Sequence, residues 1–439
     1  MVFSAFSLLR RFRMNQYLSP ERLREYQGAM LSKLAAHAYE NTVFYRRLFD
    51  GAGIGPGDIR SLDDLSKIPI TRKEDIQHAD VGQIVDRTAA VGDCVVKHTS
   101  GSTGQPLMIY LRPAERDFQI LMNLRILMEN GLRLGDTTAY IINPHRFPKS
   151  RYWFQRLGIL GREYLSVFDY PAAHVEALEK IRPDVIYGYP SNLTLLALHM
   201  KEKGPVGIQP RIVFSVAEAL EPKARTAIDS SMGVKTCDIL GTIELGDIAW
   251  QCEARAGYHL SADAVIVEFL DSAGKTVGPG EEGRIVCTSL YSYTMPFIRY
   301  AVNDICVPTD STCPCGRTLP MIESIKGRAN DFIVLPDGQI IASCFLVITM
   351  QEFHNVAQYR VIQKRKDSLD VQIVRGVGFE SSTPSAIKRE MEKAVKGSLT
   401  VAVTIVPEIP RDPSGKIRTV ISEIIPGYQS TLETGSRHE

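Results

Sequence analysis

The spacing of apolar and polar positions divides the chain into regions of different predicted structure. In residues 20–50, apolar side chains recur at intervals of three and four, which predicts helix. Ser19, followed by proline and glutamate, is typical of a helix start, and so is Ser61, followed by acids. In the middle of the chain, short apolar runs predict strands and longer amphipathic runs predict helices. The strands are expected at residues 138–142, 185–187 and 211–215, and the helices at 175–181 and 193–201.

This alternation favours an α/β fold in which helices cover a largely parallel sheet. From residue 265 to 307 the pattern changes to strands separated by Gly-rich turns. Beyond Gly327, a short apolar run, a helix-like run and strands at 358–363 and 369–374 predict a small α+β unit. We therefore expect a large domain in residues 1–326, a hinge at 327–331 and a small domain in residues 332–439.

Composition narrows the class of protein. A chain of 439 residues with 44% apolar and 23% charged residues suits a soluble two-domain protein. Its net charge of +1 argues against a dedicated nucleic-acid binder. No apolar run reaches the ~18 residues of a membrane-spanning helix, so no integral membrane segment is expected. The start of the chain lacks the features of a secretion signal, and we expect a cytoplasmic protein.

A glycine- and hydroxyl-rich loop is suited to holding phosphate. Its residues are Ser100, Gly101, Ser102, Thr103 and Gly104. Glycines let backbone N–H groups approach phosphate oxygens, and hydroxyls add donors without bulk. The loop is not a Walker motif, and an ordinary Ser/Gly surface turn would have a similar composition.

Four further segments carry polar groups that suit nucleotide chemistry. Glu244 follows a buried strand and a glycine turn, as a magnesium ligand near phosphates requires. Asp304 could accept hydrogen bonds from ribose hydroxyls. Residues 325–331 supply a charged turn at the expected domain boundary, and residues 410–416 supply the flexible cation Lys416.

Together these five ordered motifs resemble those of the adenylate-forming ligases, and within them the phenylacetate–CoA ligase and CapK-like group. The resemblance extends from residue 36 to Lys416. It implies a large N-terminal α/β domain with layered sheets and a small, mobile C-terminal α+β domain. It also implies ATP-dependent activation of a small-molecule carboxylic acid as an acyl-adenylate, with release of pyrophosphate and transfer to coenzyme A.

The resemblance also implies roles for individual residues. Glu244 would contact Mg²⁺, and Lys416 would reach the active site from the small domain as a second catalytic residue. Taken alone, Asp304 and Arg328 could equally form a surface ion pair. The implied nucleotide-binding residues are Ser100, Gly101, Ser102, Thr103, Gly104, Glu218, Leu240, Gly241, Thr242, Asp304 and Arg328.

Three positions depart from the family pattern. Leu240 replaces the usual adenine-side tyrosine, Gln105 replaces a frequent lysine, and Asn330 stands at a commonly acidic place. We interpret them as variation, because Glu244 and Lys416 are retained. The acid pocket is less well defined by the sequence. Aromatic and polar side chains that could shape it, or could equally be core and loop residues, are Tyr140, His145, Tyr189 and Ser191.

A second constellation has the composition of a zinc site. Cys252, His259, Cys313 and Cys315 are four ligands of the kind that tetrahedral Zn²⁺ takes. Because four protein ligands leave no open position, we expect a structural role. The alternative is a set of buried or loop cysteines with a hydrogen-bonded histidine. The remaining cysteines are expected in the core: Cys94, Cys237, Cys287, Cys306 and Cys344.

The sequence therefore predicts an acid–CoA ligase that uses ATP, Mg²⁺ and coenzyme A. An amide-forming ligase that transfers the acyl group to an amine, in a polysaccharide or natural-product pathway, is the alternative. An inactive, zinc-stabilised nucleotide-binding protein is an alternative of another class, against which Lys416 and Glu244 argue. A homodimer is a further expectation.

Overall fold

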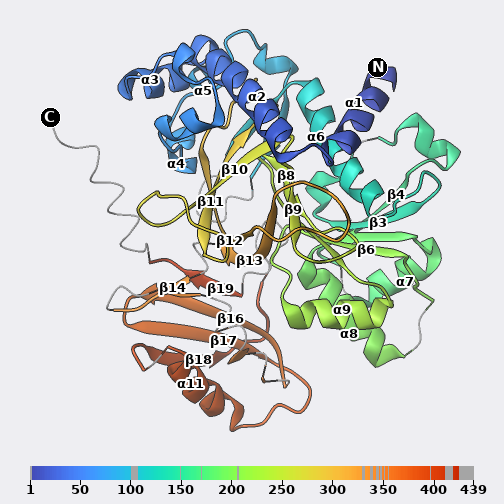
Figure 1. Cartoon of the computed structure of the whole chain (residues 1–439). Helices are drawn as coiled ribbons and strands as arrows, with labels where there is room; N and C mark the ends of the chain where they lie inside the picture. Colours follow the sequence, from blue (N-terminus) through green and yellow to red (C-terminus); the bar gives the residue numbers. More distant parts are fainter. Residues whose placement is uncertain are drawn as a thin grey trace.

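A computed structural model of the whole chain is shown in Figure 1. The structure describes residues 2–99, 107–148, 150–169, 171–204, 207–328, 332–336, 340–342, 346, 349–350, 352–353, 355–395, 397–410 and 419–424. A large mixed sheet with its helices forms the N-terminal part, and a four-stranded sheet lies in the C-terminal part. None of the helices in the described ranges is long and apolar enough to cross a membrane.

The first helices begin where the sequence predicts. Ser19 caps α2 (Pro20–Asn41) by accepting a hydrogen bond from the Arg22 N–H. The helical spacing of residues 20–50 is interrupted at Thr42, whose hydroxyl accepts from the Tyr45 N–H and caps α3 (Val43–Gly51). Ser61 caps η2 (Leu62–Lys67). The other elements of this region are α1 (Val2–Asn15), η1 (Pro56–Asp58), α4 (Lys73–Gln77), α5 (Val81–Ile84) and η3 (Val91–Asp93).

Five parallel strands form one half of the large sheet. In spatial order they are β4 (Gly161–Ser166), β3 (Thr137–Ile142), β5 (Val185–Gly188), β6 (Ile212–Val216) and β7 (Cys237–Thr242). The strands and helices predicted for this region are confirmed. The helices are α6 (Pro113–Glu129), α7 (Pro171–Ile181), α8 (Pro190–Lys203) and α9 (Pro222–Met232), with the short elements η4 (Pro144–Arg146) and η5 (Trp153–Leu157).

The other half of the same sheet is antiparallel. It contains β8 (Gly246–Trp250), β9 (Tyr258–Leu260), β13 (Met321–Arg328), β12 (Tyr300–Thr309), β11 (Gly283–Ser289) and β10 (Val265–Leu270). The prediction of a largely parallel sheet therefore holds only for the first half. The turn between β7 and β8 is short, and a short turn can join only antiparallel neighbours.

The C-terminal part has a core of its own. Strands β18 (Thr400–Ile405), β17 (Ser368–Arg375), β16 (Val356–Arg365) and β19 (Val420–Ser422) form its sheet, and α11 (Thr383–Ala394) packs against it. A hairpin of β14 (Phe332–Val334) and β15 (Ile340–Ala342) precedes this sheet. The apolar cluster of this part, in the ranges that the structure describes, begins at Ile333, beyond the last member of the N-terminal clusters at Ile325.

A fully buried ion pair fixes α1 and α6 to the large sheet. The Arg125 guanidinium donates from Nη1 to both carboxylate oxygens of Asp263 at 2.9 Å, and the Asn15 amide donates to the same carboxylate at 3.3 Å. Both charged side chains are 0% exposed. Removing one partner from such a pair leaves an uncompensated buried charge.

Replacing Asp263 with alanine should therefore lower the free energy of unfolding by about 3–5 kcal/mol. Denaturant unfolding measures this loss. Glu176→Ala is the matched control, because Glu176 pairs with Lys180 on the exposed face of α7 and should contribute less than about 1 kcal/mol. Equal losses in the two variants would contradict the structural role of the buried pair.

Candidate functional site

Several of the predicted site residues lie where β5, β6 and β7 end. In a parallel sheet, the carboxyl ends of neighbouring strands lie along one edge, and ligands of α/β proteins bind at such edges. Ser191 follows β5, Glu218 follows β6, and Leu240 to Thr242 end β7. The topology therefore gathers residues that are far apart in the sequence.

Glu218 and Ser191 are bonded to each other. The Ser191 N–H donates to Oε2 of Glu218 at 2.9 Å, and the Ser191 hydroxyl donates to Oε1 at 3.1 Å. Ala217 has a φ of +70°, a left-handed conformation that costs a non-glycine residue about 1–3 kcal/mol. The strained backbone and the two hydrogen bonds together fix the direction of the Glu218 carboxylate. The residue predicted for the nucleotide thus contacts one predicted for the acid.

The turn after β7 is tightly packed. A Cβ atom on Gly241 would lie 2.9 Å from the Gly246 carbonyl oxygen and 3.0 Å from Oδ1 of Asp247, so the position excludes any side chain. The Thr242 hydroxyl accepts from the Leu245 N–H at 3.1 Å and closes the turn. Leu240 packs against the core at the start of this segment.

Glu244 lies in the turn between β7 and β8, and its side chain is held by a residue of β12. Its Oε1 accepts a hydrogen bond from the Tyr300 hydroxyl at 3.1 Å, and the residue is 8% exposed. Burial, with the Glu244 charge as the second cause, raises the pKa of Tyr300, so the phenol stays protonated and donates. A buried carboxylate with one fixed oxygen is a suitable single protein ligand for Mg²⁺ beside phosphates.

Asp304 lies on β12, four residues beyond Tyr300. It is buried, and its Cα is paired with that of Arg328 on β13. One strand therefore carries both the residue that orients Glu244 and the residue predicted to bind ribose. Arg328 is placed by its backbone register, on the strand that leads to the expected hinge.

The residues predicted for the acid lie in different surroundings. Tyr140 stands in a row of aromatic rings on the sheet, with Tyr187 at 5.0 Å between ring centroids and Tyr164 at 5.4 Å. Tyr189 is 1% exposed and belongs to the core at the start of α8. His145 is exposed on η4.

The phosphate loop and the lysine lie outside the described residues, as do Gln105, Asn330 and Cys344. This applies to Ser100–Gly104 and to Lys416. Residues on both sides of the loop are described, and they form the hairpin of β1 (Val95–His98) and β2 (Met108–Leu111). The Thr99 N–H donates to the Leu107 carbonyl at 3.0 Å, and the Leu107 N–H donates to the Thr99 hydroxyl at 2.9 Å. The two ends of the loop are therefore held together.

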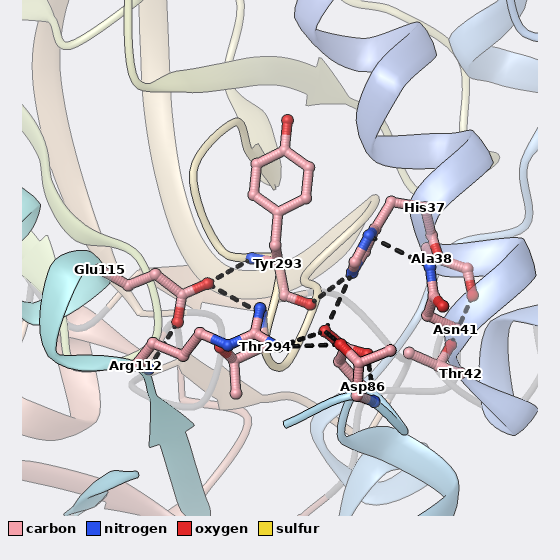
Figure 2. A network of polar contacts seen from close by, with 10 residues as sticks. His37, Ala38, Asn41, Thr42, Asp86, Arg112, Glu115, Tyr293 and Thr294 are labelled. Atoms are coloured by element: carbon pink, nitrogen blue, oxygen red, sulfur yellow. Dashed lines mark hydrogen bonds and ion pairs between the residues drawn. The ribbon is translucent and has the colours of Figure 1, made fainter. Parts of the chain in front are cut away.

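A buried polar network anchors this hairpin to the rest of the domain (Figure 2). Arg112, directly after β2, donates to Oδ2 of Asp86 at 2.9 Å and to the Thr88 hydroxyl at 3.0 Å. Asp86 is 1% exposed, and its backbone N–H donates to the Thr294 carbonyl at 2.7 Å. Although burial of Asp86 acts in the opposite direction, hydrogen bonds from Thr88 and the Arg112 charge lower its pKa.

The same network reaches α2 and α6. Nε2 of His37 lies 3.1 Å from the Tyr293 carbonyl oxygen and 3.6 Å from Oδ2 of Asp86. Oε1 of Glu115 accepts from the N–H groups of Tyr293 and Thr294 at 2.7 and 2.8 Å. The network therefore couples the base of the loop hairpin to the segment that leads into β12, which carries Tyr300 and Asp304.

Sequence reasoning missed a polar cluster beside the turn. Lys97, Asn123 and Asp247 come from β1, α6 and β8, and the aromatic row lies next to them. The sequence contains a signal that could have found two of them. Lys97 precedes the predicted phosphate loop by three residues, and Asp247 follows Glu244 by three.

The four predicted zinc ligands converge. Their ligand atoms all lie within 4.8 Å of one another, and this is the one group of its kind in the parts of the chain that the structure describes. The sulfurs of Cys252 and Cys313 are 3.5 Å apart, and Sγ of Cys315 is 3.3 Å from Nε2 of His259. Ligands of tetrahedral zinc are separated by roughly 3.5–3.8 Å, so the set fits the ion. Burial and the charge of Arg317 lower the pKa of His259 to about 4, which keeps the imidazole neutral.

The chain is similar to known ligases along most of its length. It is 27% identical over 442 residues to a phenylacetate-coenzyme A ligase of Thermus thermophilus, a match that covers 92% of this chain and 97% of the relative. The CapK C-terminal domain family matches residues 333–423.

Solved structures share the fold. The structure of 2-hydroxyisobutyryl-CoA ligase in the postadenylation state, with an acyl-AMP, aligns with a TM-score of 0.75 at 20% identity and covers 96% of this chain and 94% of its own. In the thioesterification state, with an acyl-AMP and CoA, the same ligase aligns with a TM-score of 0.63 at 21% identity and covers 96% and 94%. The anthranilate CoA ligase AuaEII, with anthranoyl-AMP, aligns with a TM-score of 0.56 at 16% identity and covers 80% and 69%.

These similarities extend over both parts of the chain. The protein is therefore similar to the adenylate-forming ligases, and within them to the phenylacetate–CoA ligases and the CapK-like proteins.

Proposed function

We propose that this protein is an ATP-dependent ligase that activates a carboxylic acid as an acyl-adenylate and then transfers the acyl group to coenzyme A. The observation that supports this most strongly is the arrangement around one sheet edge. Glu218, the 240–242 segment and Glu244 lie there, and Tyr300 joins Glu244 to the strand that carries Asp304. Relatives named as phenylacetate–CoA ligases support the reaction class.

The nucleotide is proposed to bind along this edge. Backbone N–H groups and hydroxyls of residues 100–104 would surround the phosphates. Glu218 and the 240–242 segment would line the adenine, and Asp304 would accept hydrogen bonds from the ribose with Arg328 nearby. Because Gly241 leaves no room for a side chain, its backbone surface would be the floor of this pocket.

The chemistry requires two anions to meet. A carboxylate oxygen of the acid attacks the α-phosphorus of ATP, and the bond to the bridging oxygen breaks as pyrophosphate leaves with its electron pair. The sulfur of coenzyme A, after losing its proton, then attacks the acyl carbon, and AMP leaves. Cationic and N–H groups aimed at the phosphates stabilise the charge that develops in the first step. We assign that role to residues 100–104 and Lys416.

Mg²⁺ is proposed to bind at Glu244. The ion would offset the negative charge of the phosphates, and Mg²⁺ commonly uses one or two carboxylates together with phosphate oxygens. The role of Tyr300 is to hold the Glu244 carboxylate in one orientation before the nucleotide arrives.

The two reaction steps need different surroundings, and we propose that residues 327–331 form the hinge between domains 1–326 and 332–439. Three observations support this proposal. The apolar clusters on the two sides are separate. Burial, with the charge of Glu221 at the start of α9 as the second cause, raises the pKa of the half-buried Tyr359 on β16, so the small domain lies near this part of the large domain. The higher TM-score with the postadenylation state favours an adenylation-like arrangement.

We further propose that Cys252, His259, Cys313 and Cys315 hold a structural Zn²⁺. The four side chains come from the end of β8, from β9 and from the loop between β12 and β13. A bound ion would therefore tie the loop to two neighbouring strands. With four protein ligands, it would supply no open coordination position for catalysis.

The acyl acceptor is the point on which the main alternative differs. An amide-forming ligase would make the same acyl-adenylate and transfer it to an amine. We propose coenzyme A because the relatives are named as CoA ligases. A homodimer stays a prediction, which the mass of the purified protein in solution would test.

The proposed function is tested by incubating the protein with ATP, Mg²⁺, coenzyme A and a panel of aromatic and small aliphatic acids. AMP release and acyl-CoA formation should both depend on the acid. Glu244→Gln should abolish most of this activity, whereas Glu282→Gln, at an exposed position, should retain it. Formation of an amide with added amines, without any thioester, would favour the alternative acceptor.

A further inference from the structure

A polar cluster of opposite charges lies next to the proposed site. The Lys97 ammonium donates to Oε1 of Gln119 at 2.5 Å. The Asn123 amide donates to Oδ2 of Asp247 at 2.8 Å. Gln119 and Asn123 are one turn apart on α6, so this helix presents the cation and the anion side by side.

The cluster is joined directly to the reacting end of the site. Oδ1 of Asp247 would lie 3.0 Å from a Cβ atom on Gly241, which places it against the segment proposed to hold the nucleotide. On the cationic side, Gln119 donates to the Tyr291 hydroxyl at 3.0 Å, and this hydroxyl donates to the Leu245 carbonyl at 2.5 Å. Leu245 is the neighbour of Glu244, so a molecule bound at the cluster would lie close to the proposed adenylation chemistry.

Aromatic rings form the adjoining wall. Tyr164, Tyr140, Tyr187 and Phe214 occupy the same register on the adjacent strands β4, β3, β5 and β6. Centroid distances of 5.4, 5.0 and 6.3 Å join them into a continuous row. Such ring surfaces favour contact with another flat, apolar ring.

The side chains of the cluster are partly buried and partly accessible to solvent. Lys97, Asn123, Asp247, Tyr140 and Tyr187 each keep part of their surface accessible, although β3, β5 and β8 are inner strands of the sheet. Burial raises the pKa of Asp247. It also raises the pKa of Tyr187, with the charge of Asp247 as the second cause. For Lys97, burial lowers the pKa to about 8. A few polar groups beside aromatic side chains have the composition that linings of ligand sites show.

We infer that this cluster is the specificity end of the acid pocket and that the substrate is an aromatic carboxylic acid carrying a hydroxyl group. This inference rests on the proposed function. The hydroxyl donates a hydrogen bond to Asp247 and accepts one from Lys97, while the ring lies along the row of aromatic side chains. A hydroxyl is a small neutral group that satisfies both an acceptor and a donor at once.

The opposite charges of Lys97 and Asp247 disfavour other substituents on the ring of the acid. An ammonium group would gain from Asp247 but would face Lys97, and the Arg146 and Arg116 charges also act on that side. A second carboxylate would gain from Lys97 but would face Asp247. An unsubstituted ring would leave both charged groups without a partner from the ligand after water is displaced, and such a loss is costly.

Acid-dependent exchange of labelled pyrophosphate into ATP tests the inference with the full-length protein. The panel contains benzoic and phenylacetic acids together with their hydroxy, amino and carboxy derivatives. A hydroxylated acid should exceed its unsubstituted parent in kcat/KM by roughly 10- to 100-fold. Amino and carboxy derivatives of the same ring should fall below that hydroxylated acid.

Two variants locate the preference. D247N and K97M should each reduce the ratio of the hydroxylated to the unsubstituted acid to within roughly threefold of one. D169N, at an exposed position after β4, should keep the wild-type ratio. Because a side-chain change can disturb folding, ATP affinity is measured in parallel and should stay within roughly twofold of the wild type in all three variants.

The outcomes separate this inference from the proposed function. Exchange with hydroxylated and unsubstituted acids at equal efficiency overturns the inference and leaves the ligase in place, as does a preference for an amino or carboxy derivative. An unchanged ratio in D247N that binds ATP normally also overturns it. If K97M loses ATP affinity whichever acid is present, Lys97 contacts the phosphates of ATP. That result overturns its proposed contact with the hydroxyl of the acid. Exchange with no acid at all refutes the proposed function and removes the basis of the inference.

Discussion

Replacing Lys416 with alanine is expected to slow acyl-adenylate formation by roughly 10²- to 10³-fold while leaving the protein folded. The size of the effect follows from the proposed role, since removing one preorganised donor from a developing negative charge costs this much in other enzymes. Lys416 is proposed to belong to the small domain, so its loss should leave the Glu218 and Glu244 surroundings intact. Single-turnover formation of the adenylate measures the first step.

The second step provides the sharper comparison. If the lysine acts only in adenylation, acyl-adenylate supplied to the variant should be converted to the thioester at close to the wild-type rate. Lys366→Ala, at an exposed position between β16 and β17, is the matched control and should behave as wild type in both steps. Equal slowing of both half-reactions in the Lys416 variant would contradict the proposed division of labour between the domain positions.

Removal of the proposed zinc is expected to have the largest effect on stability. Cys313→Ser should release the ion and lower the thermal midpoint, because the binding free energy of a structural metal contributes directly to folding. Elemental analysis should find close to one zinc per chain in the wild type and substantially less in the variant. The Sγ–Sγ distance of 3.5 Å between Cys313 and Cys252 is the reason for choosing this ligand.

A cysteine outside the cluster controls for the substitution itself. Cys94 is half-buried, and its sulfur contacts the Ala90 carbonyl oxygen at 3.6 Å. Cys94→Ser should keep both the zinc content and the thermal midpoint. Wild-type protein that is purified without zinc and has an unchanged midpoint in a chelator would refute the metal proposal.

The sequence predicted the order of the elements because the relevant signals are local. Ser19 and Ser61 start their helices through hydrogen bonds within four residues, and the apolar runs of β3, β5 and β6 are strands in the structure. The antiparallel half of the sheet was harder to foresee. Its pairing of β13 with β9 joins strands that β10, β11 and β12 separate along the chain, and no local pattern specifies it.

For the site, too, features that depend on nearby residues could be predicted from the sequence, and contacts between distant segments could not. Motif content led to Glu244 and to the Cys/His set, since residue type and spacing are enough to suggest ligands. It could not reveal that Tyr300 orients Glu244 or that Ser191 orients Glu218, because these contacts depend on which strands are neighbours. Lys97 and Asp247 were missed for the same reason, because their proximity depends on contacts of both residues with α6.

The central claim is that this chain forms an acyl-adenylate, and carboxylate-dependent exchange of labelled pyrophosphate into ATP measures that step alone. We expect exchange with at least one aromatic acid, no exchange when the acid is omitted, and loss of exchange in Glu244→Gln. Normal ATP binding without exchange for any acid in a broad panel would contradict the account and favour a catalytically silent nucleotide-binding protein.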